Sequence, residues 1–166
     1  MLETKAFKIT KQNLEDYIQD RPPYLFVDEA EVVAGKSAKG LRYFSKDEWF
    51  FKVHFPGNPI VPAAFLIEAI TQTAGLAIQI MKEKLKTTTL YIKKISNVEL
   101  YSAVKPDNTL FMETEITNFK RGIVDGFGTA YTMDGTKQNE HCRLEFQMVM
   151  PDILQNCSPK IEMRNK

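Results

Sequence analysis

The sequence predicts an α+β domain in which an antiparallel sheet wraps around one long buried helix. Residues 63–84 are expected to form a single helix that is apolar almost all round over its first five turns, so it must be covered on most sides. Everything after residue 87 alternates polar and apolar residues and is rich in β-formers, and two further strands precede the helix. This order of elements fits a wrapped helix but does not by itself single out that architecture.

Length and composition bound the class of protein. The 166 residues suffice for one domain with its own core, without a disulfide or metal staple. A net charge of +1 argues against sequence-independent binding of nucleic acid. The N-terminus does not resemble a signal peptide, and no membrane span is expected, so we predict a cytoplasmic protein. Cys142 and Cys157 lack a metal-ligand spacing; we expect reduced thiols and no metal site.

The other elements follow from local patterns. Thr10 is a plausible N-cap for a short amphipathic helix that ends at the prolines after Arg21. Residues 47–62 contain three prolines and a glycine within seven positions, which excludes both regular helix and central strand and predicts an ordered loop. The expected strands are residues 24–33, 38–44, 89–96, 98–104, 109–120, 122–133 and 137–150, with turn signals at residues 34–36, 105–108 and 134–135.

Two titratable residues flank the start of the long helix. A carboxyl on an apolar helix is costly to ionise, so the pKa of Glu68 should rise, and a histidine such as His54 is the usual general base. An acid and a base in such different environments are typical of proton-transfer enzymes, and the N–H groups at the helix start could polarise a carbonyl. Taken alone, His54 is more simply a hydrogen-bonded structural residue and Glu68 the partner of a buried cation. Their combination in one short segment favours chemistry.

The segment from His54 to Pro62, followed by Glu68 and Gln72, resembles the signature of (3R)-hydroxyacyl-acyl-carrier-protein dehydratases. Those proteins have the hot-dog fold, a long central helix wrapped by an antiparallel sheet. Residues 21–28 and 98–146 resemble further parts of the family pattern, so the likeness covers about residues 10–150. We therefore predict a single hot-dog domain over residues 1–150 and a polar, loosely held tail over residues 151–166.

The resemblance implies roles for both titratable residues. His54 would take the proton from the carbon next to the thioester carbonyl, and Glu68 would protonate the departing 3-hydroxyl, giving a trans-2-enoyl thioester and water. In the family this pair comes from two subunits, which implies a homodimer or a trimer of dimers. The partner would be acyl carrier protein, whose phosphopantetheine carries the substrate, and no other cofactor is implied.

The resemblance also implies substrate-binding positions. Backbone N–H groups near Gly57 and Ala63 would bind the thioester oxygen. Gln72 lies one helical turn after Glu68 and either orients it or packs as a satisfied amide. The acyl chain would lie in an apolar tunnel lined partly by Phe55, Ile60 and Phe65, three residues that are equally consistent with the core.

Three positions depart from the family pattern, and two other functions stay open. Asn58 stands where the family has a second histidine, Ala63 replaces a glycine, and Tyr101-Ser102-Ala103 replaces a basic Arg-Arg-Pro. Ala63 and the lost basic stretch keep open a non-catalytic acyl-thioester binding subunit of a hetero-oligomer. A hot-dog thioesterase is the other alternative, and His54 speaks against it. Glu68, rather than an aspartate, favours plain dehydration over dehydration with isomerisation.

Overall fold

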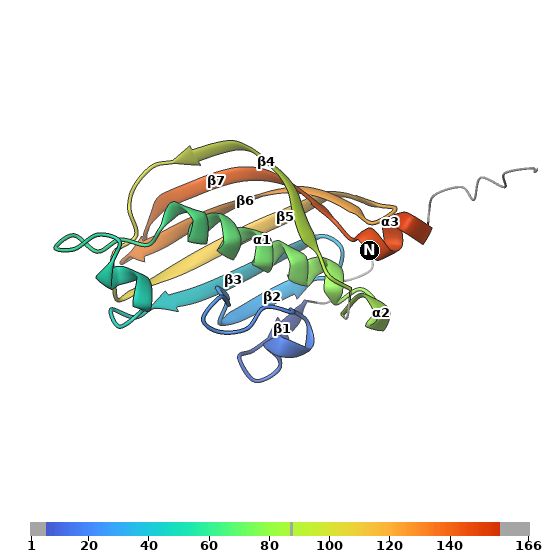
Figure 1. Cartoon of the computed structure of the whole chain (residues 1–166), viewed down its shortest axis with the longest axis horizontal. Coiled ribbons are helices and arrows are strands. Elements are labelled where there is room, and N and C mark those ends of the chain that lie inside the picture. Colours follow the sequence, from blue (N-terminus) through green and yellow to red (C-terminus); the bar gives the residue numbers. More distant parts are fainter. Residues whose placement is uncertain (1–5, 87, 157–166) are drawn as a thin grey trace, which may run out of the picture.

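The computed structural model describes residues 6–86 and 88–156 and shows one antiparallel sheet against one long helix (Figure 1). The seven strands lie in the order β1-β2-β3-β5-β6-β7-β4. In chain order the elements are β1 (Phe7–Ile9), the 3-10 turn η1 (Leu14–Asp16), β2 (Glu29–Val33), β3 (Ser37–Phe44), the 3-10 turn η2 (Trp49–Lys52), α1 (Ala63–Gln79), α2 (Glu83–Lys86), β4 (Tyr91–Leu100), β5 (Asn108–Lys120), β6 (Ile123–Asp134), β7 (Lys137–Val149) and α3 (Pro151–Asn156).

Helix α1 packs closely on the sheet, which confirms the predicted architecture. It contacts β2, β3, β5, β6 and β7. Two glycines of the sheet make the close approach possible: a Cβ at Gly40 would lie 2.7 Å from Thr73 Oγ1, and one at Gly128 would lie 2.5 Å from Ile70 Cγ2. Every residue of α1 from Ala69 to Gln79 is buried. No helix within the described residues is long and apolar enough to cross a membrane.

The prediction of an amphipathic helix that begins at Thr10 is wrong. The structure instead has β1, which pairs with β2, followed by the single turn η1. The Asn13 side chain explains the difference, since its Oδ1 accepts a hydrogen bond from the Thr10 N–H (2.8 Å) and closes a local turn. Leu14 and Ile18 are nevertheless buried, as the apolar spacing requires.

Two strand predictions also need correction. The strand expected over residues 24–33 begins only at Glu29, because a side chain of α1 takes the backbone hydrogen bonds of residues 24 and 26, as described below. The strands expected over residues 89–96 and 98–104 are one strand, β4, that ends at Leu100. Its pairing with β7 shifts register between Ser96 and Glu99, and Asn97 has a φ of 50°, so a bulge lies at the expected boundary between the two strands.

The ends of two predicted segments differ as well. Helix α1 stops at Gln79 rather than at residue 84, and α2 follows as a separate short helix. The tail was expected to be loosely held, yet residues 151–156 form α3, and Ile153 packs against the core. Residues 157–166, including Cys157, lie outside the described residues, whereas Cys142 is a buried free thiol. Strands β5, β6 and β7 lie within two residues of their predicted bounds.

Candidate active site

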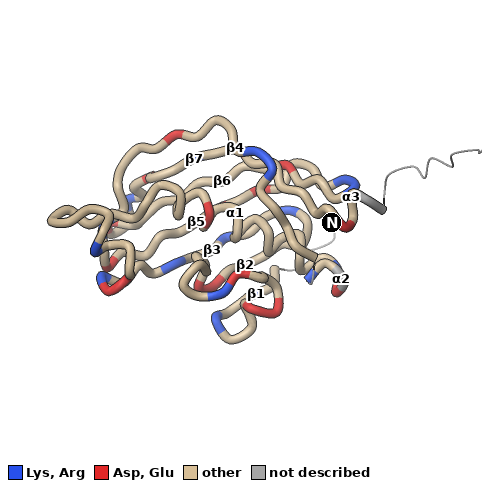
Figure 2. The backbone as a smooth tube through the Cα atoms, viewed as in Figure 1, with Lys and Arg blue, Asp and Glu red and all other residues tan. Residues whose placement is uncertain are grey.

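Glu68 is the one charged residue of α1, and it is half-buried on the second turn of the helix. The rest of α1 is coloured as uncharged in Figure 2. Its Oε1 accepts a hydrogen bond from Gln72 Nε2 at 3.0 Å. The Gln72 amide is itself fixed, since Nε2 also donates to the Tyr24 carbonyl (3.0 Å) and Oε1 accepts from the Phe26 N–H (2.8 Å). The two interpretations of Gln72 therefore both hold: it is a satisfied amide, and it contacts the carboxyl of Glu68.

The surroundings of Glu68 favour its protonated form. Burial of the side chain raises the pKa of Glu68, the nearby Asp20 carboxylate raises it further, and the hydrogen bond from Gln72 opposes both. Burial also raises the pKa of Asp20. Glu68 thus keeps its proton to higher pH than an exposed glutamate does, which suits a group that must donate a proton.

A cavity of about 200 Å³ lies against Glu68 and runs along the same face of α1. Its α1 wall carries Thr71, Gln72, Gly75 and Gln79. The facing wall comes from residues 18–20 and 89–92 together with Met148. The sequence analysis missed the contribution of Asp20 and Gln79, whose only signal was a polar side chain next to an apolar pattern.

His54 lies on a loop that is built from local hydrogen bonds. The loop follows η2, and the His54 N–H donates to the Phe50 carbonyl at 2.8 Å. The next turn places Pro56 and Gly57 between Phe55 and Asn58; the Asn58 N–H donates to the Phe55 carbonyl (3.0 Å), and Gly57 has a φ of 79°. Proline followed by a residue of positive φ is the pattern of a type II turn, and that positive φ requires a glycine.

One hydrogen bond sets the orientation of the His54 ring. Its Nδ1 lies 3.2 Å from the Ile60 carbonyl oxygen, and a carbonyl can only accept, so Nδ1 carries the proton. Nε2 is then the nitrogen with a free lone pair, as a general base needs. The peptide bond between His54 and Phe55 is cis, and their rings stack with centroids 4.0 Å apart.

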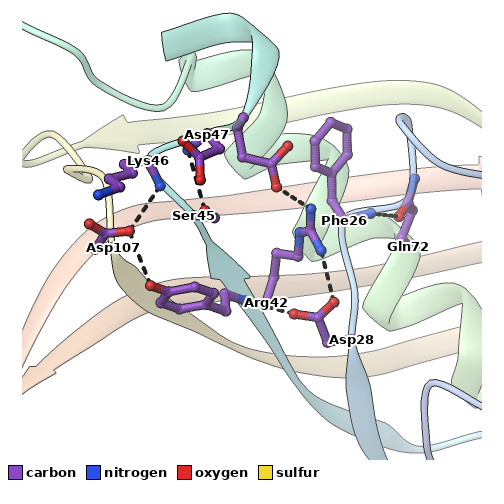
Figure 3. A network of polar contacts seen from close by, with 10 residues as sticks. Phe26, Asp28, Arg42, Ser45, Lys46, Asp47, Gln72 and Asp107 are labelled. Carbon is purple, nitrogen blue, oxygen red and sulfur yellow. Dashed lines mark hydrogen bonds and ion pairs between the residues drawn. The ribbon is translucent and has the colours of Figure 1, made fainter.

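A half-buried ion-pair network anchors the base of this loop (Figure 3). Arg42 on β3 donates through Nη1 to Asp28 Oδ1 (2.8 Å) and through Nη2 to Glu48, the residue that directly precedes η2. The second Asp28 oxygen accepts the Tyr43 N–H at 2.8 Å. All three charged side chains are only 17–18% exposed. The network therefore fixes the start of the segment that leads to His54.

The three residues predicted to line an acyl tunnel lie outside the cavity beside Glu68. Phe65 stacks on Phe26 with ring centroids 4.6 Å apart and meets Phe50 edge to face, so it belongs to the core. Phe55 is 51% exposed on the loop. Neither they nor Ile60 line the cavity beside Glu68. Ala63 begins α1 and is half-buried, and the residue before it, Pro62, provides no capping side chain.

His54 does not line the cavity that lies against Glu68 in the same chain. The loop that carries His54 projects beyond the end of the sheet (Figure 1), and none of the described residues that line the Glu68 cavity belongs to this loop. Strand β4, at one edge of the sheet, is also largely uncovered. Its exposed side chains include the large apolar residues Tyr91, Ile92, Val98 and Leu100.

Residues 19–138 match the model of the FabA-like domain. This range contains all the site residues described above except Ile18 and Met148 of the cavity wall. The chain belongs to the FabA-like family. Among the family's curated members, the 3-hydroxyacyl-acyl-carrier-protein dehydratase FabZ of Caldicellulosiruptor saccharolyticus is 38% identical over 112 residues, which cover 67% of this chain and 79% of the relative. FabZ of Bacillus subtilis is 35% identical over 125 residues, covering 75% and 87%.

Solved structures confirm the hot-dog fold of this FabA-like protein. The dehydratase heterocomplex ApeI:P from Xenorhabdus doucetiae superposes with a TM-score of 0.67 at 12% identity, covering 88% of this chain and 97% of the other. A thioesterase family protein from Silicibacter pomeroyi gives a TM-score of 0.62 at 11% identity, covering 83% and 95%. At these identities the likeness concerns the fold, which dehydratases and thioesterases share.

Proposed function

We propose that this FabA-like protein dehydrates (3R)-hydroxyacyl thioesters on acyl carrier protein to trans-2-enoyl thioesters in fatty-acid biosynthesis. The observation that carries the proposal is Glu68: one carboxyl on an otherwise uncharged helix, with a raised pKa, held by Gln72 and facing a cavity. Its FabZ relatives are named for this reaction. The phosphopantetheine of the carrier protein holds the substrate, and we propose no further cofactor.

The proposed reaction uses the two side chains as base and acid. His54 Nε2 takes a proton from carbon 2, and the electron pair of that C–H bond forms the double bond between carbons 2 and 3. The bond from carbon 3 to the hydroxyl breaks, and the leaving oxygen takes the proton of Glu68 to become water. Backbone N–H groups near Gly57 and Ala63 polarise the thioester carbonyl and stabilise the enolate that develops there.

We also propose that each site combines His54 of one copy with Glu68 of another. Two observations support this: the His54 loop projects away from its own sheet, and β4 presents an unpaired edge with large apolar side chains. A homodimer, alone or as part of a trimer of dimers, would cover that edge. We place the protein in the cytoplasm, where a buried free thiol such as Cys142 stays reduced.

The test is an absorbance assay near the enoyl-thioester band. Wild type, His54→Ala and Glu68→Gln receive a 3-hydroxybutyryl thioester and a longer homologue, on carrier protein and on coenzyme A, after circular dichroism has shown that all three are folded. We expect enoyl formation by wild type and a loss of about 10²- to 10⁴-fold in each variant. Release of free thiol would instead show a thioesterase. No turnover of any substrate would favour a non-catalytic binding subunit.

A further inference from the structure

The far end of the Glu68 cavity contains an unpaired buried amide. Gln79, the last residue of α1, is only 4% exposed and lines the cavity. Within the described part of the chain its carboxamide has no hydrogen-bond partner. Its Oε1 lies 3.9 Å from the place that a Cβ on Gly75 would occupy, so the amide lies beside the open stretch of the helix. Among the described residues the only fully buried side-chain nitrogen or oxygen without a partner is Arg42 Nε, so the polar atoms of the Gln79 amide reach the open space of the cavity and can bind a group that enters it.

The hydrogen-bond donors of Gln72 and Thr71 on the α1 wall are already used. The Gln72 amide uses both ends, as described above. The Thr71 hydroxyl donates to the Ile67 and Glu68 carbonyls of its own helix, each at 3.1 Å. Gln79 therefore differs from its neighbours on this wall in having its hydrogen-bonding capacity available.

The helix places this amide in line with the acid. Glu68, Gln72, Gly75 and Gln79 follow one another at intervals of four, three and four residues, which keeps them on one helix face. The eleven residues from Glu68 to Gln79 correspond to about 16 Å along the axis. Gly75 keeps the path between them open, since a Cβ there would come within 3.3 Å of Leu90 Cδ2.

We propose that the cavity binds acyl chains that carry an uncharged hydrogen-bonding group, a hydroxyl or a carbonyl, near the end remote from the thioester, and that Gln79 binds this group. The inference rests on the proposed function, because it takes Glu68 as the acid at carbon 3. An amide both donates and accepts, which suits either group. A terminal carboxylate is disfavoured because a buried charge needs a partner of opposite charge, and the residues described as lining the cavity include no lysine or arginine.

The experiment compares matched thioesters. Pantetheine thioesters of 3-hydroxy acids with eight, ten and twelve carbons are prepared with a terminal methyl, a terminal hydroxyl or a terminal carboxylate. For wild type we expect kcat/KM to be highest for the terminal hydroxyl, by about tenfold over the methyl at the best length. Gln79→Leu, which keeps the volume but removes the amide, should reverse that order. Gln12→Leu, at an exposed residue outside the cavity, serves as the matched control and should keep the wild-type order.

Two results would overturn the inference. One is a wild type that prefers the methyl chain at every length, and the other is a Gln79→Leu variant with an unchanged preference. If no thioester is dehydrated, the proposed function fails. The inference is then tested separately by calorimetry, which compares the dissociation constants of the methyl and hydroxyl thioesters for wild type and Gln79→Leu. A preference for the hydroxyl chain that Gln79→Leu abolishes would then support it, and equal affinities would overturn it.

Discussion

The two candidate catalytic side chains are positioned by opposite means. Glu68 lies on the buried central helix, and the amide that holds it is fixed by the backbone of residues 24 and 26, more than forty positions earlier in the chain. His54 lies on a projecting loop, and the contacts that orient it come from Phe50 and Ile60, within six positions. The position of the acid thus depends on the whole fold, whereas that of the base depends on local turn chemistry and on how the loop is anchored.

The different positioning of Glu68 and His54 limits how the two side chains can meet. A rigid acid on a helix and a base on a projecting loop can form one site only if another surface meets the loop. We propose that the unpaired, exposed edge of β4 on a second copy is this surface. The following variants weaken either the acid side or the base side, from the largest expected effect to the smallest.

Arg42→Met should cause the largest loss of stability, on the base side. It leaves the half-buried carboxylates of Asp28 and Glu48 without their cation; breaking a fully buried pair from one side costs about 3–5 kcal/mol, and we expect a loss toward the lower end of that range. Urea unfolding measures the effect. The triple variant Arg42→Met, Asp28→Asn, Glu48→Gln should recover much of the loss, because no buried charge remains. A single variant as stable as wild type would contradict the anchoring role.

Gln72→Leu should have the next largest effect, on the acid side. It leaves the Phe26 N–H and the Tyr24 carbonyl without their partner, which costs about 1–3 kcal/mol. It also removes the hydrogen bond that lowers the pKa of Glu68. The alkaline limb of the pH–rate profile should therefore move to higher pH, and an unmoved limb would show that Gln72 is structural alone.

Gly57→Ala should cost about 1 kcal/mol, because a φ of 79° is strained for any residue with a Cβ. The matched control is Gly135→Ala in the hairpin between β6 and β7, where φ is 58°. At both glycines an added Cβ meets no atom within 4 Å, so only backbone strain differs from wild type. Dehydration should fall in Gly57→Ala and stay at the wild-type level in Gly135→Ala. Equal dehydration rates in the two variants would show that the turn at Gly57 does not help to position His54.

The pH dependence of Glu68 should give the smallest change. Its folded-state pKa is raised, so its contribution to stability is complete below the unfolded pKa and is lost as pH rises through the folded value. Glu68→Gln removes this loss. As pH rises from the unfolded pKa of a glutamate to above the raised folded pKa, the free energy of unfolding of the variant should therefore change less than that of wild type. In wild type, dehydration should decline as pH rises through the same range, since only protonated Glu68 can donate.

Local patterns predicted much of this protein correctly. The buried helix, the irregular loop at residues 47–62 and the three long strands β5 to β7 each follow from apolar periodicity or turn residues. The family signature further singled out His54, Glu68 and Gln72. That resemblance, rather than periodicity, supplied their expected roles.

The errors arose where a side chain competes with the backbone or where distant segments meet. Asn13 closes a turn in place of a helix, and Gln72 takes the hydrogen bonds that a strand at residues 24–28 would use. The cavity joins Asp20, Gln79 and Leu90, which are far apart in sequence. A single sequence contains no signal for such a meeting, so the polar end of the cavity became visible only in the structure.

The central claim is that each active site takes His54 from one copy and Glu68 from another. The most direct measurement co-expresses His54→Ala and Glu68→Gln chains with different tags and isolates the mixed dimer. One of its two sites then contains both intact side chains, so the account predicts about half of the wild-type dehydration rate per dimer, although each parent variant is inactive. A mixed dimer as inactive as its parents would contradict the claim and place both residues in a site within one chain.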